Sequence, residues 1–165
     1  MRKLIVILTL AAAAVVTAIA LATPASGPAL LSAETARGTF DELPMVNTKF
    51  ANGGRVKLQV RGPVELISQR IVAKPTATFG WHFHPGENFN VIISGTLTLY
   101  HDEACTAGIE YGVGDAFSTS PTDIHLARNL GTEDLVFFAT YLAPKTTPPT
   151  LVREDAPLPG PGCPS

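Results

Sequence analysis

Short runs of apolar and polar residues fill the chain from Arg55 onward, and turn-forming residues separate them. Side chains of a strand point alternately to its two faces, so runs of this length and composition predict strands. Gly, Pro, Asn and Asp bound the runs, which is typical of a protein with many strands and few helices. We expect strands at residues 55–60, 64–73, 78–84, 89–95, 96–101, 109–113, 115–120, 124–130 and 135–143.

No helical stretch lies between these runs, so the sequence predicts an all-β fold, either a sandwich or a barrel. In a barrel, side chains from neighbouring strands can meet in the interior. The chain has 165 residues, of which 45% are hydrophobic, and this is enough for one domain with a buried core. We expect residues 46–144 to form that barrel domain.

The N-terminus has a different pattern. Arg2 and Lys3 precede an unbroken apolar run that closes with the small-residue pattern Ala20-Leu21-Ala22. A charged start, an apolar centre and such an end indicate a secretory signal peptide over residues 1–22, cleaved after Ala22. A spanning helix needs about 20 apolar residues, so an uncleaved membrane anchor is the alternative. We expect a protein that is secreted or held in the cell envelope, and that contacts the membrane only if this segment is retained.

Two further segments lack a strand pattern. Residues 23–39 are small, polar and interrupted by Pro and Gly, so we interpret residues 23–45 as a linker or N-terminal extension. Residues 145–165 form a Pro-rich tail. In an exported protein Cys105 and Cys163 are expected to pair and to tie this tail back, and two unpaired thiols are the alternative.

Charge and missing motifs exclude several functions. The chain has 12 Lys and Arg against 14 Asp and Glu, and no basic cluster that could follow a phosphate backbone. Binding to nucleic acid is therefore not expected. The sequence also lacks a Gly-x-Ser-x-Gly nucleophile motif, a phosphate-binding Gly-rich loop and a nicotinamide-binding fingerprint.

The histidines suggest a metal site. His82 and His84 lie two residues apart in an expected strand, so they face one side, and His125 lies in another strand. Three imidazoles aimed into one cavity would be poorly satisfied when neutral, whereas a divalent first-row metal uses all three nitrogen lone pairs. Because imidazole suits several ions, the site could hold Zn, Fe, Mn, Cu or Ni. His101 lies at a strand end, where we expect it to be solvated.

These residues resemble the two sequence motifs of the cupin family. The first motif contains an H-x-H pair and a closing glycine, matched by His82-Phe83-His84 and Gly95. The second contains a histidine and an asparagine with three residues between them, matched by His125 and Asn129. The mature chain is also similar to small exported cupin-domain proteins of actinobacteria. The resemblance implies a cupin-type double-stranded β-helix, or jelly-roll, barrel.

Two of the motif residues are expected to have structural roles. Gly95 would permit a tight turn between two strands. Asn129 would bond to backbone groups and not to a metal.

One position departs from the cupin pattern. Counting back from Gly95, the carboxylate of the first motif falls on Asn88, and the nearest carboxylate, Glu87, is one residue earlier. A shift of one residue in a strand turns a side chain to the opposite face. Both positions directly follow Pro85-Gly86, a turn where alternation need not hold, so Glu87 and Asn88 both stay open as further ligands. A site without a carboxylate keeps the full charge of the ion and favours an anionic ligand.

Two functions follow from the resemblance, since cupins include dioxygenases, isomerases and binders without catalysis. The first is a secreted metal-binding cupin that binds a small anionic or oxygen-bearing molecule at the three-histidine centre, with dioxygenase- or isomerase-type activity left open. The second is a non-enzymatic ligand- or metal-binding module of the cell envelope. For the histidine site itself, the alternative is a barrel that keeps its histidines but binds metal weakly. A homodimer is compatible with either.

Overall fold

All regular structure in the described part of the chain is β-strand. The computed structural model describes residues 30–102 and 105–156, and none of them forms a helix able to cross a membrane. Each expected strand is present within two residues of its expected ends, which confirms the all-β prediction. The strands are β1 (Leu30–Phe40), β2 (Val46–Lys49), β3 (Arg55–Leu58), β4 (Val64–Ala73), β5 (Thr78–Phe83), β6 (Glu87–Ser94), β7 (Leu97–Tyr100), β8 (Ile109–Tyr111), β9 (Ala116–Thr119), β10 (His125–Arg128), β11 (Leu135–Pro144) and β12 (Glu154–Asp155).

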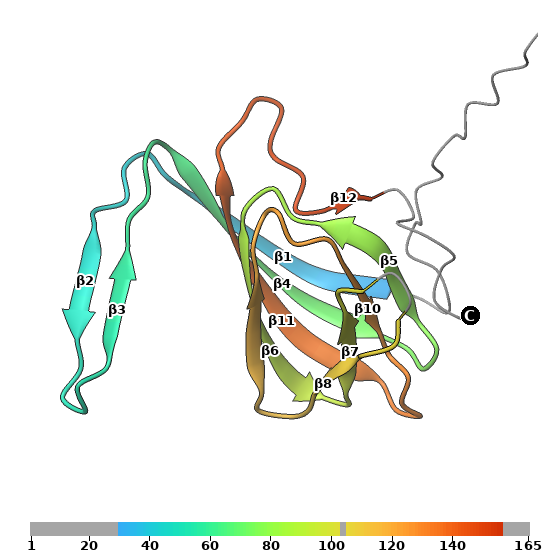
Figure 1. The fold of residues 1–165 in the computed structure, drawn as a ribbon. Coiled ribbons are helices and arrows are strands. Elements are labelled where there is room, and N and C mark those ends of the chain that lie inside the picture. The colour runs from blue at the N-terminus through green and yellow to red at the C-terminus, as the bar shows by residue number, and fades with distance from the viewer. Residues whose placement is uncertain (1–29, 103–104, 157–165) are drawn as a thin grey trace, which may run out of the picture.

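Two five-stranded antiparallel sheets form the body of the molecule (Figure 1). One has the order β1-β4-β11-β6-β9, and the other has the order β12-β5-β10-β7-β8. From β4 to β11 the chain passes repeatedly from one sheet to the other, so strands distant in sequence become neighbours. This arrangement is the double-stranded β-helix that the sequence predicted.

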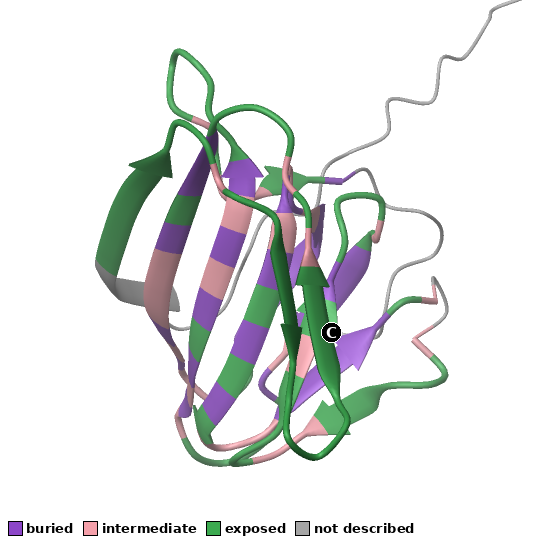
Figure 2. Ribbon diagram, turned by 90° about the vertical axis from the view of Figure 1, so that its left-hand side faces the viewer, coloured by how far each residue is buried: buried purple, intermediate pink, exposed green. Residues whose placement is uncertain are grey.

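The core lies between the two sheets. Along β6 and β11 every second residue is buried, and Figure 2 shows this alternation along the strands. Ile67 of β4, Ile92 of β6 and Leu135 of β11 are almost completely buried in one hydrophobic cluster with Leu97 and Leu99 of the other sheet. The alternation therefore assigns one face of each strand to the interior, where the site lies.

The two motif residues with expected structural roles have them. Gly95 has φ of 73° between β6 and β7, and a Cβ there would lie 2.9 Å from the carbonyl oxygen of Asp134. The Nδ2 of Asn129 donates to the carbonyl oxygens of Ala73 at 2.9 Å and Glu133 at 2.8 Å. Only a residue without a side chain fits at Gly95, and Asn129 joins two segments through backbone bonds.

The interpretation of residues 23–39 as a linker is wrong from residue 30 onward. Those residues belong to β1, which pairs antiparallel with β4 from Leu30 opposite Ala73 to Phe40 opposite Val64. Residues 35–40 are exposed, so no buried apolar face marks this edge strand in the sequence. It pairs through backbone hydrogen bonds, which depend little on the side chains.

The barrel also does not begin at residue 46. Strands β2 and β3 pair only with each other, in a two-stranded sheet that projects from the body (Figure 1). The prediction that residues 55–60 contribute to the barrel is therefore wrong. A tight turn explains the local pairing, because Phe50 N donates to Gly54 O at 2.7 Å and Gly53 N to Phe50 O at 3.0 Å.

Part of the C-terminal tail joins the second sheet. Strand β12 pairs with β5, with Glu154 opposite Phe83 and Asp155 opposite His82, and the buried Ala156 donates its N–H to Trp81 O at 2.9 Å. We call residues 150–156 the C-terminal strap. A strand in this Pro-rich segment was not predicted.

Two predictions concern residues outside the described part of the chain. The signal peptide of residues 1–22 lies there, and so does Cys163. No described cysteine is free, and the pairing of Cys105 with Cys163 stays a prediction.

Candidate metal centre

Neighbouring strands of the second sheet bring three histidines together. His82 lies on β5, His84 directly follows that strand, and His125 begins β10 in register with His82. Alternation along β5 turns Trp81 and Phe83 to the other side, where they belong to a separate hydrophobic cluster. The predicted convergence of His82, His84 and His125 is therefore present.

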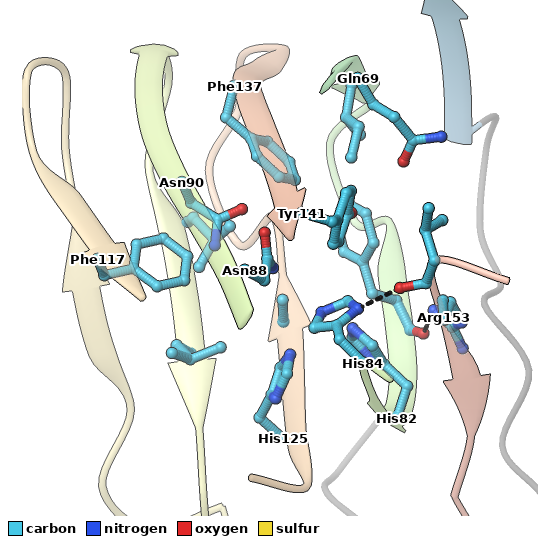
Figure 3. Close-up of a pocket in the computed structure, with 16 residues that line it drawn as sticks. Gln69, His82, His84, Asn88, Asn90, Phe117, His125, Phe137, Tyr141 and Arg153 are labelled. Atoms are coloured by element: carbon cyan, nitrogen blue, oxygen red, sulfur yellow. Dashed lines mark hydrogen bonds between the residues drawn. The ribbon is translucent and has the colours of Figure 1, made fainter. Parts of the chain in front are cut away.

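The three imidazoles form a compact group (Figure 3). All three side chains are buried, and one ring nitrogen of each lies within 4.8 Å of the others. The ring centroids of His82 and His125 are 4.4 Å apart, those of His82 and His84 5.0 Å, and those of His84 and His125 5.2 Å. Within residues 30–102 and 105–156 this is the one group of at least three His, Cys, Asp or Glu side chains with metal-binding spacing.

Each imidazole is oriented by a backbone carbonyl. A carbonyl oxygen only accepts hydrogen bonds, so the ring nitrogen beside it carries the proton of the neutral imidazole, and Nε2 keeps a lone pair. Histidines that bind metals are commonly held in this way. The pairs are His82 Nδ1 with Gly80 O at 2.8 Å, His84 Nδ1 with Val152 O at 2.6 Å, and His125 Nδ1 with Asp123 O at 2.9 Å.

Burial keeps the three histidines neutral. Desolvation is the largest cause that lowers the pKa of each, and it lowers the pKa of His84 to about 4. For His82, repulsion by His125 in its protonated form and by Arg153 lowers the pKa further. Because a protonated imidazole has no lone pair to donate, a lowered pKa favours metal binding near neutral pH.

Glu87 and Asn88, the two residues left open as further ligands, lie on opposite faces of strand β6. Asn88 is buried and lines the same cavity as the histidines, whereas Glu87 is partly exposed and lies outside the histidine group. The turn before them is fixed by close packing, since a Cβ on Gly86 would lie 2.2 Å from the carbonyl oxygen of Leu142. Alternation therefore holds from the first residue of β6. The Oδ1 of Asn88 is buried without a hydrogen-bond partner.

The histidines line one side of a cavity of about 260 Å³ (Figure 3). Its other polar lining residues are Gln69, Asn88, Asn90, Tyr141 and Arg153. The remaining lining residues are apolar, namely Ile71, Phe79, Leu97, Leu99, Phe117, Ala127, Phe137 and Val152. No carboxylate is among the described residues that line it.

Sequence analysis missed Arg153 of the C-terminal strap. Its Nε donates to Asp155 Oδ1 at 2.9 Å, its Nη2 donates to the same oxygen, and its Nη1 donates to Phe79 O. These bonds hold the guanidinium beside the histidines. The strap has no regular spacing of apolar residues that would predict a strand. The one hint in the sequence was the spacing of Arg153 and Asp155, which form an ion pair.

The fourth histidine lies apart from the group. The side chain of His101 is 41% exposed, and its Nδ1 is 2.8 Å from Asp123 Oδ1. It was expected to be solvated, and the structure agrees.

Part of the chain matches a known sequence family. Residues 69–141 match the sequence family described as Cupin domain, whereas no curated protein matches the chain. One similar solved structure is an uncharacterized conserved protein with a double-stranded β-helix domain from Klebsiella pneumoniae, with 22% identity, a TM-score of 0.44 and coverage of 55% of this chain and 74% of that chain.

Two further solved structures are similar at the same level. A Cupin 2 conserved barrel domain protein from Salinispora arenicola has 18% identity and a TM-score of 0.42, over 65% of this chain and 74% of that chain. Oxalate decarboxylase from Bacillus subtilis has 20% identity and a TM-score of 0.45, over 55% of this chain. The match spans only 23% of the decarboxylase.

Proposed function

We propose that this chain, whose residues 69–141 match the cupin domain family, binds a divalent transition metal through His82, His84 and His125. One observation carries the proposal: all three Nδ1 atoms are paired with carbonyl oxygens, which leaves three Nε2 lone pairs in one buried group. Without an ion, these lone pairs would also stay unprotonated near neutral pH, because burial lowers the pKa of each histidine. Three neutral nitrogen donors suit Zn, Fe, Mn, Cu or Ni.

We further propose that the occupied site binds a small anionic or oxygen-bearing molecule. Neutral imidazoles leave the ion its full charge, and no carboxylate lines the described cavity to balance it. When bound, the ion would supply Lewis acidity and an open position for a ligand oxygen. Asn88 could add its unpartnered amide oxygen, either to the ion or to a donor on the ligand.

Catalysis of a dioxygenase or isomerase type is one proposal for this site, and binding without catalysis is the other. Catalysis would depend on the ion, because no Asp, Glu or Lys among the described lining residues could act as a general acid or base. Burial raises the pKa of Tyr141, so its phenol stays protonated near neutral pH.

We also propose export, with the chain beginning at Thr23 after cleavage and Cys105 bonded to Cys163. Mass spectrometry of protein from the culture medium or envelope would test both points. An intact Met1 in a membrane fraction, or two titratable thiols without reduction, would contradict them.

The metal proposal is tested by titrating the metal-free protein with Co(II) and following its visible absorption. We expect saturation at about one ion per chain, and a change in the spectrum when azide then occupies an open position. Saturation without any change on adding azide would contradict the anion proposal, and no saturable binding would contradict the metal proposal. Oxygen uptake by iron-loaded protein with diols, thiols and keto acids separates catalysis from binding.

A further inference from the structure

We infer that the cavity selects small monocarboxylates with a compact apolar body, with the carboxylate beside Arg153 and the histidines and the body against the apolar wall. This inference rests on the proposed anion site and names the class of ligand that it takes. Three observations support it: the position of the single charged lining residue, the composition of the rest of the wall, and the size of the cavity.

Positive charge is confined to one end of the cavity. Arg153 is the one Asp, Glu, Lys or Arg residue among the described lining residues, and Figure 3 shows it beside His82 and His84. A guanidinium has five N–H groups. Asp155 Oδ1 accepts one N–H of Nε and one of Nη2, and Phe79 O accepts one N–H of Nη1. One N–H on each Nη atom is left, and each of them can donate to a carboxylate oxygen.

The opposite wall is mainly apolar, with Asn90 beside Phe117 (Figure 3). The rings of Phe79 and Phe137 pack edge to face with their centroids 5.8 Å apart, and Leu97 and Leu99 are almost fully buried. Phe117 is stacked on Tyr111 at 4.3 Å. In Figure 3, Phe117 and Phe137 lie across the cavity from Arg153. This wall would remove water from a ligand's apolar body but offers no charge to a second carboxylate.

The cavity is also small. Its volume of about 260 Å³ is below the range of roughly 300–1,000 Å³ that is typical of sites for drug-sized ligands. A short aliphatic or single-ring monocarboxylate is the class that combines this size with one charged end. A second carboxylate at the far end would lose its hydration against Phe79 and Phe137 and would find no positive charge among the described lining residues there.

The test is a chain-length series on the zinc-loaded protein, measured by calorimetry. From acetate to propionate, butyrate and pentanoate, we expect the affinity to rise about fourfold for each added methylene, because each is buried against apolar groups. Adipate should bind at least about tenfold more weakly than hexanoate, from which it differs by a second carboxylate. An affinity that is equal along the series, or equal for adipate and hexanoate, would overturn the inference.

Arg153→Gln tests the position of the carboxylate. It should lower the affinity for every member of the series by roughly tenfold or more while the rise per methylene stays the same. Lys145→Gln is the matched control, because Lys145 is an exposed cation paired with Asp41 outside the cavity, and it should change nothing. Equal affinities of Arg153→Gln and the parent protein would overturn the placement.

Failure of this inference can be told from failure of the proposed function. Zinc that binds stoichiometrically while the series stays flat refutes only the ligand class. If zinc does not bind, the metal proposal fails, and the same series on the metal-free protein still tests Arg153 and the apolar wall. Should Arg153→Gln not fold, the series on the parent protein alone decides.

Discussion

Two segments meet at His84, and they hold the candidate site in different ways. Strand β5 supplies imidazole nitrogens and is paired on both sides, with β10 and with β12. The C-terminal strap supplies the Val152 carbonyl and the Arg153 guanidinium, but β12 is an edge strand paired through only two residue pairs. The donor atoms therefore belong to the interior of a sheet, whereas the carbonyl that orients His84 depends on a short edge strand. The two contributions can be perturbed separately.

Lowering the pH should have the largest effect, because it protonates the buried histidines and so destabilises the metal-free protein. The pKa of His84 is about 4 in the folded chain and about 6.5 in an unfolded one, so the unfolded chain binds more protons between these values. Stability of the metal-free protein is therefore full above about pH 6.5 and falls as the pH drops towards 4. For His84 alone the loss is about 3 kcal/mol.

Urea unfolding of the metal-free protein between pH 7 and pH 4 measures this effect. His84→Gln should flatten the profile, whereas Lys145→Gln should keep it, because Lys145 is an exposed cation paired with Asp41 outside the cavity. A stability that is constant with pH, or that rises in acid, would show that the histidines are not held neutral by burial.

Detaching the strap should have the next largest effect. Ala156 is fully buried against β5, so Ala156→Asp would place a carboxylate there and release β12. His84 Nδ1 would lose the Val152 carbonyl, and metal affinity should fall about 10- to 100-fold, as is usual when such a partner is lost. Glu154→Gln, an exposed change on the same strand, is the control.

Zinc affinity by competition with a chelator measures this loss, and hydrogen exchange of the backbone amide at position 156, in the variant and in the parent protein, reports whether the strap has detached. If exchange becomes fast while the zinc affinity is unchanged, the strap does not orient His84. The comparison between β5 and the strap would then fail.

The smallest effect is expected at Glu87. Its side chain lies outside the histidine group, so Glu87→Gln should change metal affinity by less than about twofold. Asn88→Glu, on the cavity side of the same strand, should instead tighten the ion and weaken carboxylate binding, because it lowers the charge of the site. A loss of metal in Glu87→Gln as large as that expected for a histidine variant would place Glu87 among the ligands.

The contrast between β5 and the C-terminal strap also explains which parts of the site could be predicted from the sequence. His82, His84 and His125 are side chains in strands with a clear pattern, so their convergence followed from alternation. The carbonyl of Val152 could not be identified, since every residue has a carbonyl and only the fold decides which one reaches a histidine. Arg153 was missed because the strap has no apolar period.

Similar reasons apply to the rest of the fold. Strand β11 buries alternate residues, and both β4 and β11 were predicted almost to the residue. Strand β1 was missed because residues 35–40 are exposed, and the projecting hairpin of β2 and β3 was assigned to the barrel because pairing partners are not visible in a single run. The choice between Glu87 and Asn88 depended on the packing of Gly86 against β11.

The central claim is that three histidines, and not the fourth, hold one metal ion. Its most direct test is the metal content per chain after dialysis against a weak chelator, for His82→Ala, His84→Ala, His125→Ala and the exposed His101→Ala. We expect about one ion per chain in the parent protein and in His101→Ala, and little in the other three, because each of them removes one of three protein donors. Equal metal content in all four variants would contradict the claim.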